Sequence, residues 1–189
     1  MSNDKKKVVL IGIYLEGIYP RGRNEVEANL LALPMLKAAA DANADIKEQY
    51  DIVVLNLPAS LTSDEVAQKI LQENPVAVGY SVYVWNLDLI TSVAKIINSK
   101  DSKVINFAGG PEVTYSSVDI LNSYMQFDFI VGGAGEERFI EILKNNLDPL
   151  KKPQVCGITY RDSTGKAKKI ENTHPFPEDL TKIPSPYSS

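Results

Sequence analysis

The stretch KVVLIGIY, from Lys7 to Tyr14, is almost continuously apolar. Such a short apolar run indicates a strand that is buried on both faces, as in a parallel sheet covered by helices. Four later runs share this character: DIVVLNL (51–57), PVAVGYS (75–81), KVINFA (103–108) and FDFIV (127–131). Because helix-like stretches separate these runs, the pattern predicts an α/β fold with a doubly wound, five-stranded parallel sheet.

Five helices are predicted from apolar periodicity and from polar residues at helix starts. They cover residues 24–42, 63–71, 86–97, 117–124 and 136–143. We expect Pro34 to kink the first helix, because a proline inside a helix removes a hydrogen bond and clashes with the preceding turn. Asn86 is expected to cap the third helix.

The character of the chain changes after residue 146. Two extended pieces flank the turn sequence from Asp162 to Gly165, which predicts an appended β-hairpin over residues 147–172. Prolines crowd the stretch from Pro175 to Pro186, so residues 173–189 are expected to form a linker.

Composition limits the classes of function. The 189 residues are 44% hydrophobic and 23% charged, as in ordinary globular domains. A net charge of −4 argues against a nucleic-acid partner. No apolar run approaches the roughly 18 residues of a membrane helix, and the polar start lacks the apolar stretch of a signal peptide. We therefore expect a cytoplasmic protein without a membrane partner.

One cysteine and one histidine restrict the metal chemistry. Cys156 alone can neither form a disulfide within the chain nor hold an iron–sulfur cluster. Its apolar neighbours Val155 and Ile158 predict an inert, buried thiol. His174 lies in the proline-rich tail, where a solvated or packing role is favoured over metal ligation. No metal ligand and no catalytic residue is predicted in this chain.

A ligand is expected beyond the carboxyl ends of the strands, where open α/β sheets bind their ligands. The candidate residues in these loops are Glu16, Gly17, Tyr19, Ser81, Val82, Tyr83, Trp85, Gly109, Gly110, Pro111, Glu112, Gly133, Ala134, Gly135 and Glu136. Paired glycines permit close backbone approach, and a serine hydroxyl can bond a heterocycle nitrogen. The loops therefore suit a bulky, mostly neutral ligand in a narrow slot, although tight turns would account equally well for each glycine pair.

Three familiar ligand classes are disfavoured by the loop after the first strand. A dinucleotide fold requires G-x-G-x-x-G there, and residues 14–23 do not supply it. A flavodoxin-type phosphate cradle requires hydroxyl groups, and no serine or threonine occurs between Ile11 and Asn43. A phosphoacceptor receiver requires an acidic pair and a later aspartate, where the chain has only Glu16 and then Ser81.

Five segments, taken in order, resemble the N-terminal part of cobalamin-dependent radical SAM enzymes. They are GYSVYVWN (79–86), AGGPEV (108–113), DFIVGGAGE (128–136), GITY (157–160) and IPSPY (183–187). Ser81 and the pair Gly109-Gly110 are similar to the S-x-L and G-G elements of the wider flavodoxin-like or Rossmann-like B12-binding fold, with Tyr83 in place of the leucine. GAGE stands at 133–136 where the family usually has G-E-G-E.

The resemblance implies a cobalamin-binding domain over residues 1–146, followed by the hairpin and by a linker toward a radical SAM domain that this chain lacks. The D-x-H-x-x-G element of the wider fold is absent, since Leu15 to Gly22 contains no histidine, and this absence is typical of the radical SAM branch. This implies base-off cobalamin without a histidine ligand to cobalt, with Trp85 or Tyr83 expected at the lower face of the ring. In the parent enzyme the resemblance implies a [4Fe-4S] cluster, S-adenosylmethionine, and methyl transfer or cyclisation, as in the anaerobic magnesium-protoporphyrin ester cyclase.

Two alternatives stay open at this point. One is a non-catalytic doubly wound domain that binds a nucleotide, a flavin or a protein partner. The other is a freestanding corrinoid protein that shuttles methyl groups, which fits poorly because it requires the missing histidine element. Whether this chain is itself an enzyme is left undecided, because it lacks the cysteines of the catalytic domain.

Overall fold

The computed structural model describes residues 5–16, 31–151, 154–171 and 183–187. Their seven strands form one sheet in the order β2-β1-β3-β4-β5-β6-β7. The strands are β1 (Lys6–Tyr14), β2 (Tyr50–Pro58), β3 (Ala77–Ser81), β4 (Ile105–Gly109), β5 (Phe129–Val131), β6 (Ile158–Arg161) and β7 (Ala167–Lys169). Pairing is parallel from β2 to β5 and antiparallel beyond it. The predicted α/β class is confirmed, with seven strands in the sheet in place of five.

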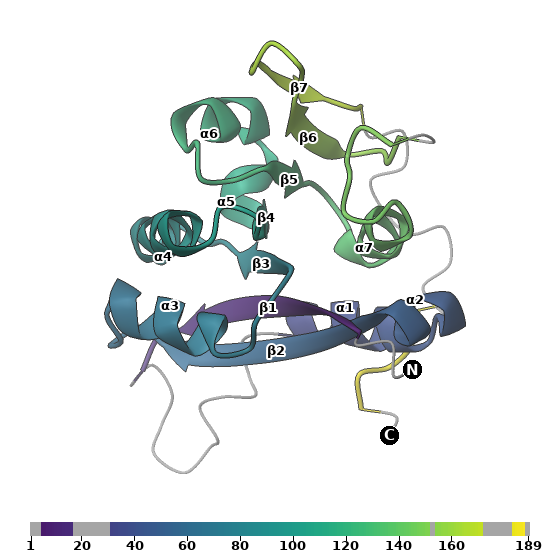
Figure 1. Ribbon diagram of the computed structural model, residues 1–189, viewed down its shortest axis with the longest axis horizontal. Coiled ribbons are helices and arrows are strands. Elements are labelled where there is room, and N and C mark those ends of the chain that lie inside the picture. The colour runs from purple at the N-terminus through teal and green to yellow at the C-terminus, as the bar shows by residue number, and fades with distance from the viewer. Residues whose placement is uncertain (1–4, 17–30, 152–153, 172–182, 188–189) are drawn as a thin grey trace.

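Helices cover both faces of the sheet (Figure 1). They are α1 (Ala32–Asp41), α2 (Ala44–Gln49), α3 (Ser63–Leu71), α4 (Leu87–Lys100), α5 (Pro111–Thr114), α6 (Ser117–Ser123) and α7 (Gly135–Lys144). The range of α3 agrees with the prediction, and Thr62 caps it through a reciprocal capping box with Glu65. The short helices α2 and α5 were not predicted, because six and four residues are too few to show a helical period.

Two details of the helix predictions were wrong. Pro34 causes no kink, because α1 begins at Ala32 and so places the proline in the first turn, where a missing N–H costs nothing. Residues 24–30 of the predicted helix lie outside the described residues. Asn86 precedes α4 but forms no side-chain cap. Its side chain instead binds the loop that precedes the helix.

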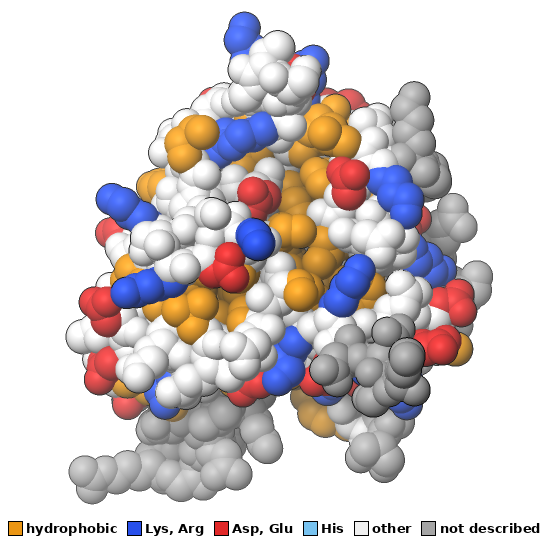
Figure 2. Space-filling view, in the orientation of Figure 1, with side chains coloured by type: hydrophobic (Ala, Val, Ile, Leu, Met, Phe, Trp, Pro, Cys, Tyr) orange, Lys and Arg blue, Asp and Glu red, His pale blue; other side chains and the backbone are white. Residues whose placement is uncertain are grey.

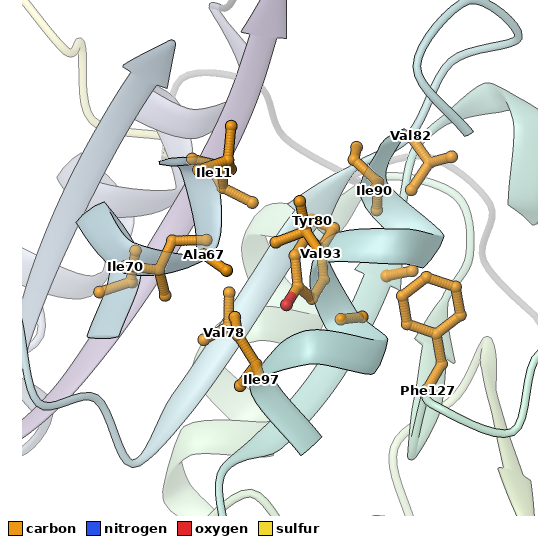
Figure 3. Close-up of a cluster of buried hydrophobic side chains, with 14 of the residues drawn as sticks. Ile11, Ala67, Ile70, Val78, Tyr80, Val82, Ile90, Val93, Ile97 and Phe127 are labelled. Carbon is orange, nitrogen blue, oxygen red and sulfur yellow. The ribbon is translucent and has the colours of Figure 1, made fainter. Parts of the chain in front are cut away.

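Each face of the sheet has its own hydrophobic core. The closed face packs β1, β3 and β4 against α3, α4 and α6, with Val78, Tyr80, Val82 and Phe127 among its buried side chains (Figure 3). The opposite face, here called the cleft face, packs against α1, α2 and α7 through residues such as Leu10, Phe107 and Phe139. Strand alternation divides neighbouring residues between these two cores.

Strands β6 and β7 form an antiparallel hairpin that extends the sheet beyond β5. Asp162 orders its turn by accepting hydrogen bonds from the backbone N–H groups of Thr164 (2.8 Å) and Lys166 (3.2 Å). Hydrogen bonds from the side chains of Thr164 and Lys168 lower the pKa of Asp162 below its usual value. Gly165 takes the positive φ of 81° that closes the turn.

The prediction of a buried Cys156 was wrong. Cys156 is exposed, because residues 156–157 form a turn and the strand begins only at Ile158. Gly157 has a φ of 74°, so the apolar pattern around Cys156 spans a turn and the start of a strand.

The surface carries charges of both signs, interleaved on the face shown in Figure 2, with hydrophobic side chains visible between the helices. None of the helices in the described ranges has the length and apolar character needed to cross a bilayer.

Candidate functional site

A cleft lies between the cleft face of the sheet and the helices α1 and α7. Its cavity volume is about 180 Å³, smaller than the roughly 300–1,000 Å³ that is usual for small-molecule sites, and it opens to solvent. Its lining residues are Leu10, Ala32, Leu33, Leu36, Gly79, Tyr80, Ser81, Tyr83, Phe107, Gly109, Gly110, Pro111, Val131, Gly133, Gly135, Glu136 and Phe139. The cleft therefore opens at the carboxyl ends of β3, β4 and β5, as expected for a doubly wound sheet.

Strand register arranges the floor of the cleft in two rows. The deep row runs across four strands through Leu10, Gly79, Phe107 and Phe129, which are paired in succession. The rim row, two residues nearer the strand ends, runs through Ser81, Gly109 and Val131. Because side chains alternate along a strand, both rows face the cleft.

Gly79 lets an aromatic ring lie flat on the deep row. A Cβ on Gly79 would come within 2.5 Å of Cζ of Phe107 and 2.8 Å of Cδ2 of Leu10. The ring of Phe107 therefore covers the glycine, and it stacks on Phe129 with ring centroids 5.2 Å apart. These residues close the inner end of the cleft with apolar atoms.

Gly110 holds the loop after β4 against the end of β3. It has a φ of 110°, and a Cβ there would lie 2.5 Å from the carbonyl oxygen of Val82. The N–H of Val82 in turn donates to the carbonyl oxygen of Gly109 at 2.8 Å. Only glycine permits both this backbone conformation and this close approach.

Ser81 supplies a hydroxyl group to the rim row. Only 7% of its surface is exposed, and among the described residues nothing bonds to its Oγ atom. The Oγ atom is not among the fully buried side-chain atoms without a partner, which in the described residues are Oδ1 of Asn56 and a guanidinium nitrogen of Arg161, so the hydroxyl is accessible from the cleft. Ser81 is therefore suited to bond a polar atom of a ligand in the cleft.

Asn86 orders the loop between β3 and α4. Its buried side chain accepts a hydrogen bond from the N–H of Tyr83 at 2.8 Å and donates to the carbonyl oxygen of Ser81 at 3.1 Å. Within this loop the rings of Tyr83 and Trp85 stack with centroids 4.4 Å apart. Trp85 remains 49% exposed, so it is not packed between helix and sheet.

The structure brings together eight of the predicted site residues along the cleft. These are Ser81, Tyr83, Gly109, Gly110, Pro111, Gly133, Gly135 and Glu136. Gly135 also brings α7 close to α1, since a Cβ there would lie 3.2 Å from Cδ2 of Leu36. Glu136 lies in the first turn of α7, where a carboxylate is favoured by the helix dipole.

Five other predicted residues lie near the cleft without lining it. Val82 is buried and contributes its backbone, and Trp85 stacks on Tyr83. The carbonyl oxygen of Ala134 accepts a hydrogen bond from the buried side chain of Arg138. Glu16 is exposed at the end of β1, and Glu112 lies on α5. The remaining two, Gly17 and Tyr19, lie outside the described residues.

The apolar walls of the cleft were missed at the sequence level. Leu10, Gly79 and Phe107 line it from within the strands, and Leu33, Leu36, Val131 and Phe139 complete its walls. Gly79 precedes Ser81 by two residues, and Phe107 precedes Gly109 by two, so strand alternation could have placed them on the same face. A glycine inside an apolar strand is also a known sign of close approach.

No group of three or more His, Cys, Asp or Glu side chains is placed to hold a metal ion within the described part of the chain.

Comparison with known families identifies the family of this chain. The sequence profile described as the B12 binding domain matches residues 31–143, more than half of the 189. This range includes most of the cleft-lining residues. Cobalamin, the predicted cofactor, is the ligand for which this family is named.

Relatives of this chain include enzymes that carry such a domain. The cobalamin-dependent radical SAM methyltransferase TokK of Streptomyces tokunonensis is 28% identical over 90% of this chain and 24% of its own length. The solved structure of the cobalamin-dependent S-adenosylmethionine radical enzyme OxsB, with aqua-cobalamin and S-adenosylmethionine bound, has a TM-score of 0.67 at 18% identity, covering 90% of this chain and 23% of OxsB.

A second fold neighbour is the radical S-adenosylmethionine methyltransferase TsrM from Kitasatospora setae. Its TM-score is 0.58 at 12% identity, over 90% of this chain and 31% of TsrM. At such identities OxsB and TsrM show the fold alone. The resemblance seen in the sequence is confirmed by the family profile and by the relatives. The chain spans about a quarter of the length of TokK.

Proposed function

Because the chain belongs to the B12 binding domain family, we propose that it is the cobalamin-binding module of a B12-dependent radical SAM enzyme of the methyltransferase or cyclase type. The cleft beside Ser81, Gly109 and Gly110 receives the nucleotide tail of the cofactor, and the corrin ring lies over the strand ends. When bound, the corrin cobalt supplies methyl-transfer chemistry to the parent enzyme.

The unpartnered hydroxyl of Ser81 is the observation that carries this proposal. Ser81 as a residue is more than nine-tenths buried, and it lies on the rim row of a cleft whose other described lining residues are glycines and apolar side chains apart from Tyr80, Tyr83 and Glu136. A flat heterocycle with one accepting nitrogen fits such a cleft, because it satisfies the hydroxyl and buries its remaining surface against apolar walls. Gly110 keeps the rim free of a side chain, and Gly79 lets the ring of Phe107 lie close against the floor.

The cofactor is bound without a histidine ligand from the protein. The only histidine of the sequence is His174, far along the chain from the loop after β1. Tyr83 and Trp85, stacked at the end of β3, are the side chains that would shield the cobalt of the bound cofactor from water.

Reconstitution tests cofactor binding. The 189-residue chain is incubated anaerobically with hydroxocobalamin, desalted and examined by absorption spectroscopy, with FMN and ATP in parallel samples. We expect the corrin bands to be retained near one equivalent and neither nucleotide to be retained. Retention of FMN or ATP without corrin would replace this proposal with the non-catalytic binding module.

Electron paramagnetic resonance tests the coordination of cobalt. After reduction to Co(II), the bound cofactor should show no nitrogen hyperfine splitting, and His174→Ala should leave the spectrum unchanged. Trp85→Ala should alter the absorption spectrum or lower the affinity. If Trp85→Ala leaves the spectrum and the affinity unchanged, Trp85 does not shield the bound cofactor.

The parent enzyme can be tested from its gene. A radical SAM domain requires three cysteines spaced C-x-x-x-C-x-x-C, which we expect shortly after the codon for Tyr187. A gene that encodes no such cysteines would leave a cobalamin carrier without radical SAM chemistry.

A further inference from the structure

The inner end of the cleft is chemically different from its rim. The deep row presents Leu10 and the ring of Phe107, with Phe139 in contact with that ring at a centroid distance of 6.2 Å. Leu33 of α1 covers the same space from the helix side. All of these side chains are hydrocarbon, so the inner end offers no hydrogen-bonding side chain to a ligand.

Two backbone carbonyl groups near the rim are already paired. The carbonyl oxygen of Gly109 accepts from the N–H of Val82, and that of Gly110 accepts from the N–H (3.2 Å) and the hydroxyl (2.7 Å) of Thr114. Tyr83 follows the end of β3, and Glu136 lies in the first turn of α7, so both line the cleft outside the deep row. Among the described residues of the rim row, Ser81 is the one that offers a hydroxyl group to a ring entering between the sheet and α1.

We propose that this cleft selects corrinoids by their lower base and takes a benzimidazole in preference to a purine. This inference rests on the proposed function and deepens it. A benzimidazole carries one free ring nitrogen, which Ser81 can satisfy, and a carbocycle that suits Leu10, Phe107 and Phe139. Adenine carries further ring nitrogens and an amino group, which would lose their hydration at the inner end without gaining partners.

The primary experiment compares three corrinoids on the unaltered 189-residue chain. They are hydroxocobalamin, the corresponding adeninyl cobamide, and cobinamide, which lacks the base. Equilibrium dialysis with detection of the corrin absorbance gives each affinity. Because the two bases leave cobalt with different ease, each affinity is corrected for the base-off equilibrium of the free cobamide, measured by acid titration of its absorption spectrum.

We expect the corrected affinity for cobalamin to exceed that for the adeninyl cobamide at least tenfold. Equal corrected affinities would overturn the inference while leaving the proposed function in place. Equal affinities for cobalamin and cobinamide would also overturn it, since the base would then lie outside the cleft. If none of the three is retained, the proposed function itself fails.

A matched pair of variants tests the role of the inner end. Phe107 lines the cleft, whereas Phe127 is buried to a similar degree on the closed face. Phe107→Leu should lower the affinity for cobalamin several-fold and leave the affinity for cobinamide unchanged, and Phe127→Leu should change neither. Circular dichroism and thermal unfolding establish that both variants fold. Equal effects of the two variants on cobalamin affinity would overturn the assignment of Phe107.

Discussion

The two faces of β3 use alternate residues of one strand for opposite purposes. Toward the closed face it presents Val78 and Tyr80, which are fully packed against α3, α4 and α6 (Figure 3). Toward the cleft face it presents Gly79 and Ser81, which are small and leave space. The comparison teaches that this strand is stabilised through one set of side chains and binds ligand through the other, so the two properties can be altered separately.

The closed face also contains a buried polar network. The hydroxyl of Tyr80 donates to Oδ1 of Asn106 at 2.7 Å, and Nδ2 of Asn106 donates to Oδ1 of Asn98 at 2.5 Å. Such a satisfied network holds strand and helix in one arrangement. On the cleft face, Ser81 has no such partner among the described residues. Substitutions on the two faces should therefore differ in their effects on stability and on cobalamin binding, and four are considered from the largest expected effect to the smallest.

Phe127→Ala should lower the free energy of unfolding by about 3–5 kcal/mol, because it opens a cavity in a core that water cannot fill. Chemical denaturation measures this change, and cobalamin affinity should stay unaltered. Phe107→Ala serves as the matched variant on the cleft face. It should cost less stability, since the space joins an open cleft, and should weaken cobalamin binding. If both variants lose the same stability and keep the same cobalamin affinity, the two faces do not differ in function.

Gly110→Ala should lower the free energy of unfolding by about 3 kcal/mol and abolish cofactor retention. The side chain would meet both an unfavourable φ of 110° and the carbonyl oxygen of Val82. Gly165→Ala is the control, because Gly165 also has a positive φ of 81° but nothing within 4 Å of the added carbon. That variant should retain cobalamin and lose only about 1 kcal/mol. If Gly110→Ala retains cobalamin and loses no more stability than Gly165→Ala, the close backbone approach at the rim is not required for binding.

Gly79→Ala should cost about 2 kcal/mol of stability through overpacking and lower cobalamin affinity at least tenfold. The added carbon would collide with the ring of Phe107, which lines the cleft, and would displace it. Combining it with Phe107→Leu should restore part of the affinity, because the smaller side chain relieves the collision. A double variant that binds no better than Gly79→Ala would contradict this mechanism.

Tyr80→Phe should have the smallest effect, about 1 kcal/mol at neutral pH, because it removes one buried hydrogen bond. Its signature is the pH dependence of stability. Burial, followed by the charge of Asp128, raises the pKa of Tyr80 well above its ordinary value of 10.0. Above pH 10 the unfolded chain therefore loses this proton while the folded chain keeps it, so stability falls as pH rises.

Tyr80→Phe should reduce that alkaline loss of stability, by up to about 1.4 kcal/mol per pH unit. Denaturant titrations at pH 9 to 11 measure the slope. Tyr115→Phe is the control, since Tyr115 is 90% exposed. The prediction fails if the two variants have the same slope as the unaltered chain.

Much of the fold could be predicted because each strand or helix shows its pattern of apolar and polar residues within a short stretch of sequence. The apolar run of β1, the polar start of α3 and the glycine-rich turn before α7 each lie within about ten residues of sequence. The errors arose where neighbours in space decide the outcome. The effect of Pro34 on the helix depends on where α1 begins, and the exposure of Cys156 depends on the turn that precedes β6.

The candidate site was predicted in part for the same reason. Ser81 and the glycines after β4 and β5 follow from the rule that ligands lie at strand ends, which requires only strand order along the chain. The apolar inner end required the register that sets Leu10, Gly79 and Phe107 side by side. Register joins strands far apart in the sequence, and no local pattern encodes it.

By itself, the sequence determined the α/β class, the family to which the chain belongs, and the absence of a histidine in the loop after β1. These properties reside in residue identity and local spacing. Only the tertiary structure decided that Phe107 lies on Gly79, that Asn86 orders the loop holding Tyr83, and that Ser81 is left without a partner. The physical reason is that close packing and hydrogen-bond satisfaction are properties of atoms brought together by folding.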